Sequence, residues 1–480
     1  MNFRSVLAIE GVLLIFLGLF MLIPAGFSLY YREDDLSAIL ISAGISVTVG
    51  LVLRLGFRLN GDLRLKDSYA TVSLGWLLAA FFGALPFYLS GYIPSLTDAF
   101  FESMSGFTTT GASILANVEA LPHGLLLWRS LTQWLGGMGI IVLSLAILPL
   151  LGVGGMQLFK AEIPGPVPDK LRPRIQETAK ILWGVYALLS LAEVLLLMAG
   201  RMSLFDSLCH TFATMATGGF STKNASIAHF HSLYIEVVVI FFMFLAGTNF
   251  SLHYHGVRGR LQAYWKSEEF RFYLGFVAGG IVLVTLANLL AGPAGLFGAL
   301  RQSSFQVVSI LTTTGFATVD FGHWAPAGQM ILLLLMFFGG CAGSTGGSIK
   351  ILRVMILLKQ GRVELRKLLH PHAVLPVRVD GRVVSPVIVS NVLAFVFLYF
   401  IIFVVASLLM SLMGLDLVSA FSSVAAMLGN VGPGLGLVGP AANYLHIPAA
   451  GKCLLSFCML AGRLEIYTLL ILLTSDFWQK

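Results

Sequence analysis

The chain has 480 residues, of which 57% are hydrophobic and 11% are charged, and its mean hydropathy is +0.88. Soluble globular proteins carry about 25% charged residues, so this composition excludes a soluble fold, and its apolar content excludes a disordered chain. The formal net charge of +7 does not indicate nucleic-acid binding, because membrane proteins gather lysine and arginine on their cytoplasmic side. The composition therefore predicts an integral membrane protein that is surrounded by membrane lipid and has no nucleic-acid partner.

Long apolar segments predict about ten membrane-spanning helices, since a helix needs about 20 apolar residues to cross a bilayer. In chain order they lie near residues 6–30, 36–57, 68–91, 124–150, 176–200, 232–256, 271–292, 326–358, 385–413 and 446–474. The first is expected to remain in the protein as a membrane helix, because no small-residue cleavage site precedes Tyr30. The fold class expected is an all-α integral membrane protein.

Basic residues are concentrated in four of the loops between these segments. The loops cover residues 54–67, 152–180, 256–271 and 350–382, and they hold most of the 30 lysine and arginine residues. Alternating spans place all four loops on the same side of the membrane. The positive-inside rule then predicts that these loops and both chain ends are cytoplasmic.

Four shorter apolar pieces are too short to cross a membrane, and they lie near residues 95–107, 204–216, 299–312 and 416–428. Each runs into a turn rich in glycine or threonine. The turns read FTTTGAS from residue 107, MATGGFS from 215, LTTTGFA from 311 and LGNVGPG from 428. Aligning the last glycine of each core equates Gly111, Gly219, Gly315 and Gly432. All four pieces fall on the outer side, which favours re-entrant helices that enter the membrane and turn back.

The alignment indicates an internal fourfold repeat of span, short helix, turn and span. An N-terminal helix pair over residues 1–60 is expected to lie outside the repeat. The four repeated units are expected at residues 68–151, 175–257, 270–360 and 384–476. Such a repeat predicts a pseudo-fourfold axis on which the four turns meet.

Four glycine-containing turns around one axis indicate a pathway for a cation. Non-helical backbone at membrane depth is tolerated where it lines a water-filled cavity, and glycine permits the positive φ that such a turn uses. Carbonyl oxygens can then replace the hydration shell of an ion, and the negative C-terminal ends of the short helices also favour a cation. A dehydrated monovalent cation fits best, because the cores carry no carboxylate ring and no arginine. In the alternative, the turns only close helical hairpins.

Four longer fragments carry a resemblance to a known family. They are WLGGMGIIV from residue 134, AGTNFSLHY from 246, GGCAGSTGGSIK from 339 and GNVGPGLG from 429. With the fourfold repeat and the extra N-terminal helix pair, they resemble the TrkH branch of the TrkH/KtrB/HKT superfamily of potassium transporters. The resemblance implies four fused M1–P–M2 units with re-entrant pore helices, in a multi-pass protein of the bacterial cytoplasmic (inner) membrane.

The resemblance assigns the four turns to a potassium selectivity filter that is formed by main-chain carbonyls. It implies that K⁺ is the substrate, that K⁺ binds at these residues only, and that the chain holds no cofactor. The filter residues would be Thr108, Thr109, Thr110, Gly111, Ala216, Thr217, Gly218, Gly219, Thr312, Thr313, Thr314, Gly315, Gly429, Asn430, Val431 and Gly432. Gly111 favours a potassium-conducting type, because sodium-preferring plant relatives have serine at this first filter glycine.

A second site lies in the third unit, where small and polar residues interrupt an apolar span. The resemblance implies an intramembrane gate loop here, with the residues Gly339, Gly340, Gly343, Ser344, Thr345, Gly346 and Gly347. This composition can break a helix and change shape at low cost. A close glycine contact between helices is the alternative.

Arg463 lies deep in the last apolar segment and matches an arginine that faces the pore below the filter in this family. A charge well inside a span costs about 2.5–3.5 kcal/mol, so it normally faces water or a partner. Our hypothesis is that Arg463 is an electrostatic barrier whose interaction with the gate loop controls ion flow. A structural ion pair is the alternative. Lys452, nearer the outer end of the segment, is expected to extend to the membrane surface.

The resemblance also implies a homodimer that works with a cytosolic TrkA-type nucleotide-binding ring. The chain contains no Walker A sequence, so nucleotide control would come from that partner, and the basic cytoplasmic loops, above all residues 350–382, are the expected docking surface. Potassium uptake through a gated filter is the leading function, and a proton- or sodium-coupled symporter on the same scaffold is the alternative. An enzyme is not expected, because neither paired intramembrane aspartates nor an HExxH helix occurs.

Overall fold

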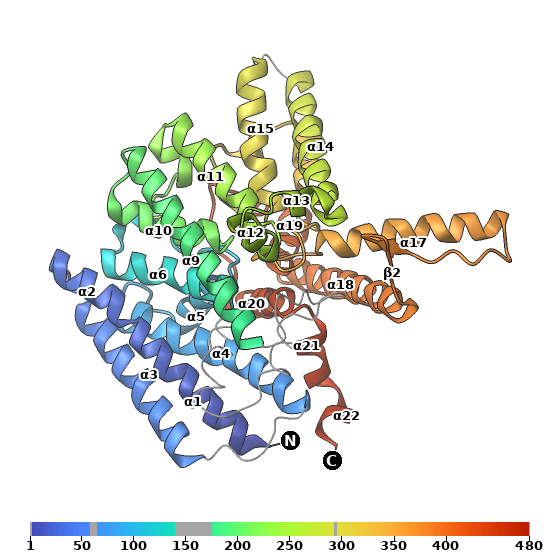
Figure 1. Ribbon diagram of the computed structural model, residues 1–480. Coiled ribbons are helices and arrows are strands. Elements are labelled where there is room, and N and C mark those ends of the chain that lie inside the picture. The colour runs from blue at the N-terminus through green and yellow to red at the C-terminus, as the bar shows by residue number, and fades with distance from the viewer. Residues whose placement is uncertain (1, 58–64, 140–174, 292–294, 480) are drawn as a thin grey trace.

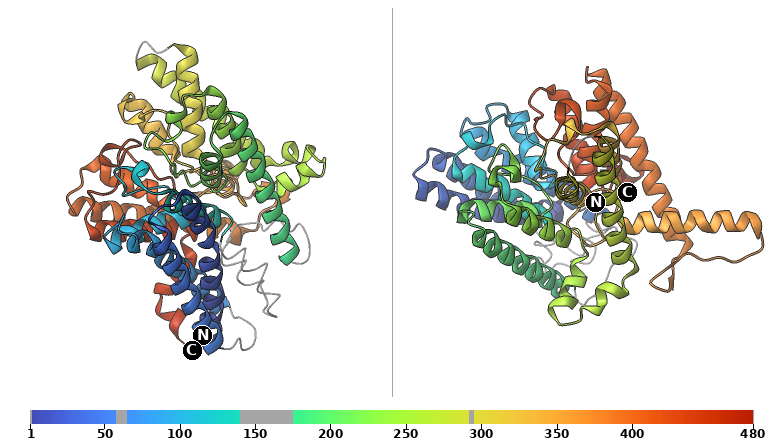
Figure 2. Two further views of the ribbon diagram at one scale, coloured as in Figure 1. Left: turned by 90° about the vertical axis from the view of Figure 1, so that its left-hand side faces the viewer. Right: turned by 90° about the horizontal axis from the view of Figure 1, so that it is seen from above.

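The computed structural model describes residues 2–57, 65–139, 175–291 and 295–479. These residues are helical almost throughout, and Figures 1 and 2 show helices gathered around a common centre. The described strands are β1 (Arg378–Val379) and β2 (Arg382–Val383), which form one short antiparallel hairpin. The expected all-α architecture is therefore confirmed.

The N-terminal helices pack on each other through glycine. Helix α1 (Phe3–Phe20) runs into α2 (Leu22–Tyr31), and α1 lies against α3 (Leu36–Gly56). A Cβ added at Gly11 would lie 2.6 Å from the carbonyl oxygen of Gly50, and a Cβ added at Gly50 would lie 2.7 Å from that of Gly11. The two backbones thus approach so closely that neither position has room for a side chain.

This contact gives a first testable prediction about stability. Substitution Gly50→Val is expected to destabilise the folded protein by about 1–3 kcal/mol, because the new side chain overpacks the α1–α3 contact. Gly44 lies on the same helix with no atom within 4 Å of an added Cβ, so Gly44→Val is the matched control. Thermal unfolding in detergent should show a lower midpoint for Gly50→Val only; equal midpoints for the two variants would contradict the packing argument.

The rest of the chain repeats one order of elements four times. Each repeat begins with a long helix, and these are α4 (Leu65–Leu89), α9 (Ile175–Ala199), α14 (Glu268–Ala291) and α18 (Pro386–Leu412). Each long helix is followed by a short one, and these are α5 (Leu96–Phe107), α10 (Leu204–Met215), α15 (Leu296–Leu311) and α19 (Leu417–Leu428). The short helices lie within about three residues of the predicted pieces. Three of them begin at a side-chain cap, supplied by Ser95, Ser203 and Asp416, which accepts a hydrogen bond from the first turn.

In the second, third and fourth repeats, the helix that follows the turn is interrupted. In the first repeat, helix α6 (His123–Gly137) follows the turn, and the part of the predicted span 124–150 that begins at residue 140 lies outside the described residues. Helices α11 (Leu233–Ala246) and α12 (Phe250–Val257) meet at a bend of 107°. A non-helical segment separates α16 (Pro326–Leu335) from α17 (Ile351–Leu369). Helix α20 (Ala449–Arg463) meets α21 (Tyr467–Leu470) and the following 3₁₀ turn at 116°.

Because of these interruptions, fewer of the described helices cross a membrane without a break than the ten that the sequence predicts. Within the described ranges, six helices are long and apolar enough to cross a membrane, or up to eight if each bent pair is one span. The predicted segment near 326–358 is not a continuous helix, because its middle forms a loop. The chain is a multi-pass membrane protein.

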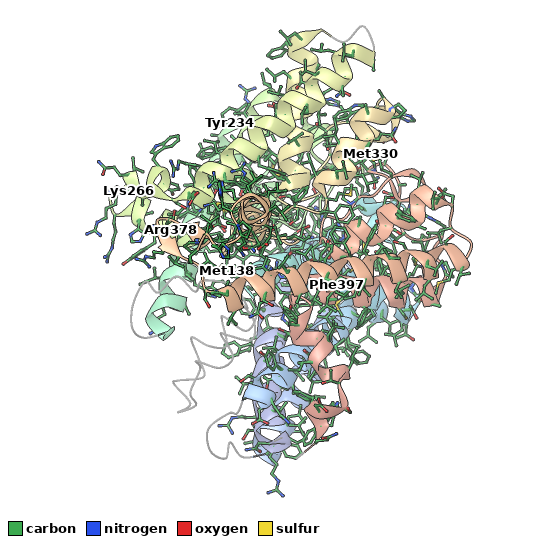
Figure 3. The ribbon with its side chains drawn as sticks, turned by 90° about the vertical axis from the view of Figure 1, so that its right-hand side faces the viewer. Met138, Tyr234, Lys266, Met330, Arg378 and Phe397 are labelled. Atoms are coloured by element: carbon green, nitrogen blue, oxygen red, sulfur yellow. The ribbon has the colours of Figure 1, made fainter. Side chains whose placement is uncertain are left out.

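Shorter elements complete the described structure. They are α13 (Gln262–Lys266), α22 (Ser475–Trp478) and the 3₁₀ turns at Val118–Ala120, Ser226–Phe230, Phe321–His323, Gly436–Val438 and Ile471–Leu473. Helix α17 projects from the rest of the molecule in Figure 1. Figure 3 shows apolar side chains such as Met330 and Phe397 on the outside, where they are 55% and 67% exposed, as expected for a surface that faces lipid.

Candidate ion pathway

Each of the four turns continues a short helix with backbone of alternating handedness. The first residue of each turn is right-handed, with φ between −73° and −81° at Thr108, Ala216, Thr312 and Gly429. The second residue has a positive φ of 52° to 61°, and these residues are Thr109, Thr217, Thr313 and Asn430. The last residue is a glycine with φ of 75° to 99° in all four turns. Because residues with a Cβ rarely adopt positive φ, the same strained conformation at four aligned positions indicates a functional constraint.

The four turns form a closed ring. At the last glycine of each turn, an added Cβ would lie 1.9–2.5 Å from a carbonyl oxygen of another turn. The pairs are Gly111 with Gly218, Gly219 with Thr314, Gly315 with Val431, and Gly432 with Thr110. Each turn therefore touches the next, and the fourth touches the first. The structure thus brings together all four turns that the sequence predicts, in chain order around one axis.

The short helices hold the turns by equivalent hydrogen bonds. In each turn the third residue donates its N–H back to a carbonyl of the short helix, at 2.8–2.9 Å. The donor–acceptor pairs are Thr110 with Ser105, Gly218 with Ala213, Thr314 with Ser309, and Val431 with Ala426. The negative C-terminal end of every short helix is therefore directed at the ring.

In the second turn, one carbonyl bonds a side chain from another helix. The side-chain amide of Gln133, on α6, donates to the oxygen of Gly218 at 2.6 Å and accepts from the N–H of Phe220 at 3.0 Å. A side chain thus occupies one of the carbonyl oxygens of this turn. Sequence reasoning missed Gln133, because nothing in its own segment links it to a turn 85 residues away.

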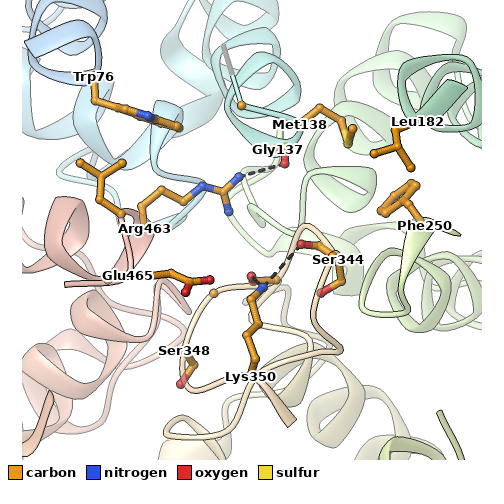
Figure 4. Close-up of a pocket in the computed structure, with 16 residues that line it drawn as sticks. Trp76, Gly137, Met138, Leu182, Phe250, Ser344, Ser348, Lys350, Arg463 and Glu465 are labelled. Atoms are coloured by element: carbon orange, nitrogen blue, oxygen red, sulfur yellow. Dashed lines mark hydrogen bonds between the residues drawn. The ribbon is translucent and has the colours of Figure 1, made fainter. Parts of the chain in front are cut away.

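A cavity opens on each side of the ring. The cavity on the side expected to be outer is lined by the last glycine of all four turns, together with residues that include Arg129 and Lys223. The inner cavity is lined by the gate loop, Trp76, Lys350 and Arg463. Figure 4 shows the side chains of the inner cavity. The ring therefore lies between two cavities, which is the arrangement that a pathway through it requires. Among the described residues, no group of three His, Cys, Asp or Glu side chains could hold a metal ion.

The predicted gate loop, Gly339–Gly347, lies directly under the ring. Its Gly347 N–H donates to the hydroxyl of Thr313 at 2.7 Å, and the hydroxyl of its Thr345 donates to the carbonyl of Met215 at 3.0 Å. A Cβ added at Gly339 would lie 2.0 Å from the oxygen of Gly347, so the loop folds tightly on itself. The loop thus blocks the inner face of the third turn and contacts the second short helix.

Arg463 joins the gate loop to the first repeat. Its guanidinium donates to the carbonyl of Thr345 at 2.8 Å, to that of Gly137 at 2.9 Å, and to that of Gly136. Figure 4 shows the guanidinium directed at Gly137, with the ring of Trp76 on one side. The neighbouring carboxylate of Glu465 pairs with Arg353 at the start of α17. Sequence reasoning placed Arg463 below the filter but could not identify these carbonyl acceptors.

Two lysines behave differently from the sequence-based expectation. Lys452 does not extend to the surface: it is buried and pairs with Asp98 of α5 at 2.6 Å, so that prediction is wrong. Burial of the amine is compensated by the carboxylate, which lies on the neighbouring short helix. Lys350 was predicted only as one of many cytoplasmic basic residues. Its amine lies in the inner cavity, where it donates to carbonyls of Ser344 and Gly346.

Comparisons with known proteins identify the family of this chain. The TrkH family, described as "Cation transport protein", matches residues 36–480. The chain is 43% identical to the Trk system potassium uptake protein TrkH of Escherichia coli (strain K12), over 100% of both chains. It is 42% identical to TrkH of Halomonas elongata, again over 100% of both chains. It also matches the crystal structure of the potassium transporter TrkH from Vibrio parahaemolyticus, with a TM-score of 0.90, 38% identity and 100% of both chains covered. The chain therefore belongs to the TrkH family of cation transport proteins.

Proposed function

We propose that this chain takes up potassium ions across the cytoplasmic (inner) membrane through the ring of four turns. The observation that carries the proposal is the closed ring itself, in which four aligned glycines each touch a carbonyl of a neighbouring turn. Backbone of alternating handedness directs successive carbonyls to one side, so the ring can offer oxygens in place of water around a dehydrated K⁺. Relatives over the full length are named potassium uptake proteins, which favours K⁺ as the substrate and transport without enzymatic chemistry.

The sixteen turn residues would then form the selectivity filter, and the repeat units 68–151, 175–257, 270–360 and 384–476 would each supply one quarter of it. The gate loop and Arg463 would close its inner face. Three charge-assisted hydrogen bonds from Arg463 support this role, because they hold the loop against the first repeat. Two cationic groups in one cavity, Arg463 and Lys350, would also repel a potassium ion that leaves the ring.

Both chain ends would be cytoplasmic. The ring of Phe3 stacks on that of Trp478 at 6.4 Å, so the two ends lie side by side, as Figure 1 also shows. An even number of membrane crossings is consistent with such placement. The basic residues of α17 and of the β1–β2 hairpin would then face the cytosol, in accordance with the positive-inside rule.

A cytosolic TrkA-type nucleotide-binding ring would regulate this chain, which would work as a homodimer. Helix α17 follows the gate loop directly and projects from the molecule, so a partner that moves it can act on the loop. We expect the triple substitution Arg362→Ala, Arg366→Ala and Lys367→Ala to abolish co-purification of the ring. Replacing Arg32 and Arg201 with alanine is the control, because these exposed arginines would lie in loops on the other side of the membrane. Retention of the ring by the α17 variant would contradict the docking assignment.

Uptake by living cells tests the function. A strain that lacks its own potassium systems, supplied with this chain and its regulatory partner, should grow at low external potassium. Growth that does not recover would overturn the proposal. Uptake that collapses with the proton or sodium gradient at constant membrane voltage would instead indicate a symporter. Gly111→Ser should weaken the preference for potassium, because its Cβ would lie 2.1 Å from the oxygen of Gly218.

A further inference from the structure

A buried ion pair lies behind the first two turns. Glu102, on α5, and Arg129, on α6, meet at 2.6 Å between Oε1 and Nε. Their side chains are 0% and 4% exposed, so both charges are taken out of solvent. Desolvating a buried pair of this kind is costly, and the attraction between the charges offsets that cost only where the geometry is good and further hydrogen bonds satisfy both groups.

Both partners are bonded to the backbone that follows a filter glycine. The carboxylate of Glu102 accepts from the N–H of Ile114 at 2.9 Å and from the hydroxyl of Ser113 at 3.0 Å, just after Gly111. The guanidinium of Arg129 donates to the carbonyl of Ser221 at 3.0 Å, just after Gly219. It also lies 3.6 Å from the centre of the Phe220 ring. The pair is thus a bridge from the first turn to the second.

The other three repeats have no such bridge at the aligned positions. Nine residues before the filter glycine, the counterparts of Glu102 are His210, Gln306 and Ser423. At the seventh residue of the following helix, the counterparts of Arg129 are Val239, Leu332 and Leu455, all fully buried. His210 and Gln306 bond hydroxyls of their own turns, Ser221 at 2.9 Å and Thr318 at 3.4 Å. The bridge between turns is therefore confined, among these aligned positions, to the first repeat.

The first turn also lacks an anchor that two others have. Phe220 and Phe316 directly follow the glycines of the second and third turns, and both rings are buried. The first turn has Ala112 at this position, whose methyl group supplies much less contact area. The first turn, which the ion pair contacts, thus has less apolar packing after its glycine than the second and third turns.

We propose that Glu102 and Arg129 are positioning residues that fix the spacing between the first and second turns, and thereby determine the preference for K⁺ over Na⁺. This inference rests on the proposed function of the ring as a potassium filter. The carbonyl groups can distinguish ions of slightly different radius only while the turns keep their separation. Neither side chain touches the ion, so the expected effect is on selectivity rather than on the existence of transport.

Arg129→Lys is the decisive variant, because it keeps the charge but loses the planar fork that bonds both Glu102 and Ser221. In liposomes containing the full chain, we expect Arg129→Lys and Glu102→Gln to lower the ratio of K⁺ to Na⁺ flux about tenfold while total flux persists. Lys223→Gln is the matched control. It removes a charge from the wall of the same outer cavity without breaking the bridge, so the ratio should stay unchanged.

The possible outcomes distinguish a failure of the positioning role from a failure of the proposed function. A selective unmodified chain together with an equally selective, folded Arg129→Lys variant would overturn the positioning role alone. An equal loss of selectivity in Lys223→Gln would overturn it in favour of simple electrostatics. If Glu102→Gln does not fold, Arg129→Lys still decides, because it leaves no buried charge unpaired. An unmodified chain that passes no potassium even with its regulatory partner present would overturn the proposed function and the inference with it.

Discussion

Substitution Gly219→Ala is expected to reduce potassium uptake by about a hundredfold or more. The added Cβ would lie 1.9 Å from the oxygen of Thr314 in the next turn, and the backbone at Gly219 has a φ of +75°. A side chain in the left-handed region costs about 1–2 kcal/mol. Overpacking costs about 1–3 kcal/mol more. Because about 1.4 kcal/mol corresponds to a factor of ten, the conducting geometry would be lost in nearly every molecule.

The measurement is potassium uptake at equal amounts of protein in the membrane. Gly275→Ala is the control, because Gly275 lies in α14 with nothing within 4 Å of an added Cβ. It should retain uptake and, as a helix-interior replacement of glycine, should not reduce stability. Normal uptake by Gly219→Ala would show that the ring does not carry the ion.

The sequence predicted the four turns well because the signals that define them are local. An apolar piece of about 12 residues followed by a glycine at a fixed distance identifies each copy, and glycine permits the positive φ that the turn has there. The positive φ of the second turn residue, such as Thr109, has no such signal in the sequence. Repetition then placed Gly111, Gly219, Gly315 and Gly432 on one axis. No local signal, however, gives the contact between one glycine and the carbonyl of the next turn, since that depends on how the repeats pack.

The expectations that failed concern partners far apart in the chain. Hydropathy places a lysine near the end of a span at the membrane surface. Lys452 instead pairs with Asp98, which lies 354 residues earlier in the chain. Hydropathy counts the segment 326–358 as one span, whereas the small and polar residues within it predict the break that the structure has. In the structure α16 ends at Leu335 and α17 begins at Ile351. Backbone contacts among glycines such as Gly339 and Gly347 close the loop between the two helices.

The backbone beyond Arg463 explains how this side chain is placed. Both Glu465 and Ile466 have positive φ, at 53° and 61°, which is rare for any residue with a Cβ and rarer for a β-branched one. This strained break turns the chain by 116° between α20 and α21. Arg463 is therefore the last residue of α20, and the Glu465–Arg353 ion pair connects the break to α17. The arginine is therefore held by an arrangement that is costly to maintain, as functional sites often are.

Substitution Arg463→Ala is accordingly expected to raise the basal flux of potassium about tenfold. It removes a positive charge from the inner cavity and all three bonds that join the gate loop, through Thr345, to Gly136 and Gly137. Hydrogen bonds to a charged group contribute about 1.5–3 kcal/mol each, so the loss of even one is enough for a factor of ten. Flux into liposomes without the regulatory partner is the measurement, because the partner would otherwise set the gate.

Arg463→Lys distinguishes the electrostatic effect of the positive charge from the effect of the hydrogen bonds to the gate loop. Lysine keeps the positive charge in the inner cavity but cannot form the planar fork that reaches carbonyls of two repeats. If electrostatic repulsion alone limits flux, Arg463→Lys should conduct as the unmodified chain does. If the bonds to the gate loop are what close the pathway, it should conduct nearly as freely as Arg463→Ala. Unchanged flux in Arg463→Ala, with a lower unfolding temperature, would assign the arginine a structural role only, and the gate would then depend on the loop itself.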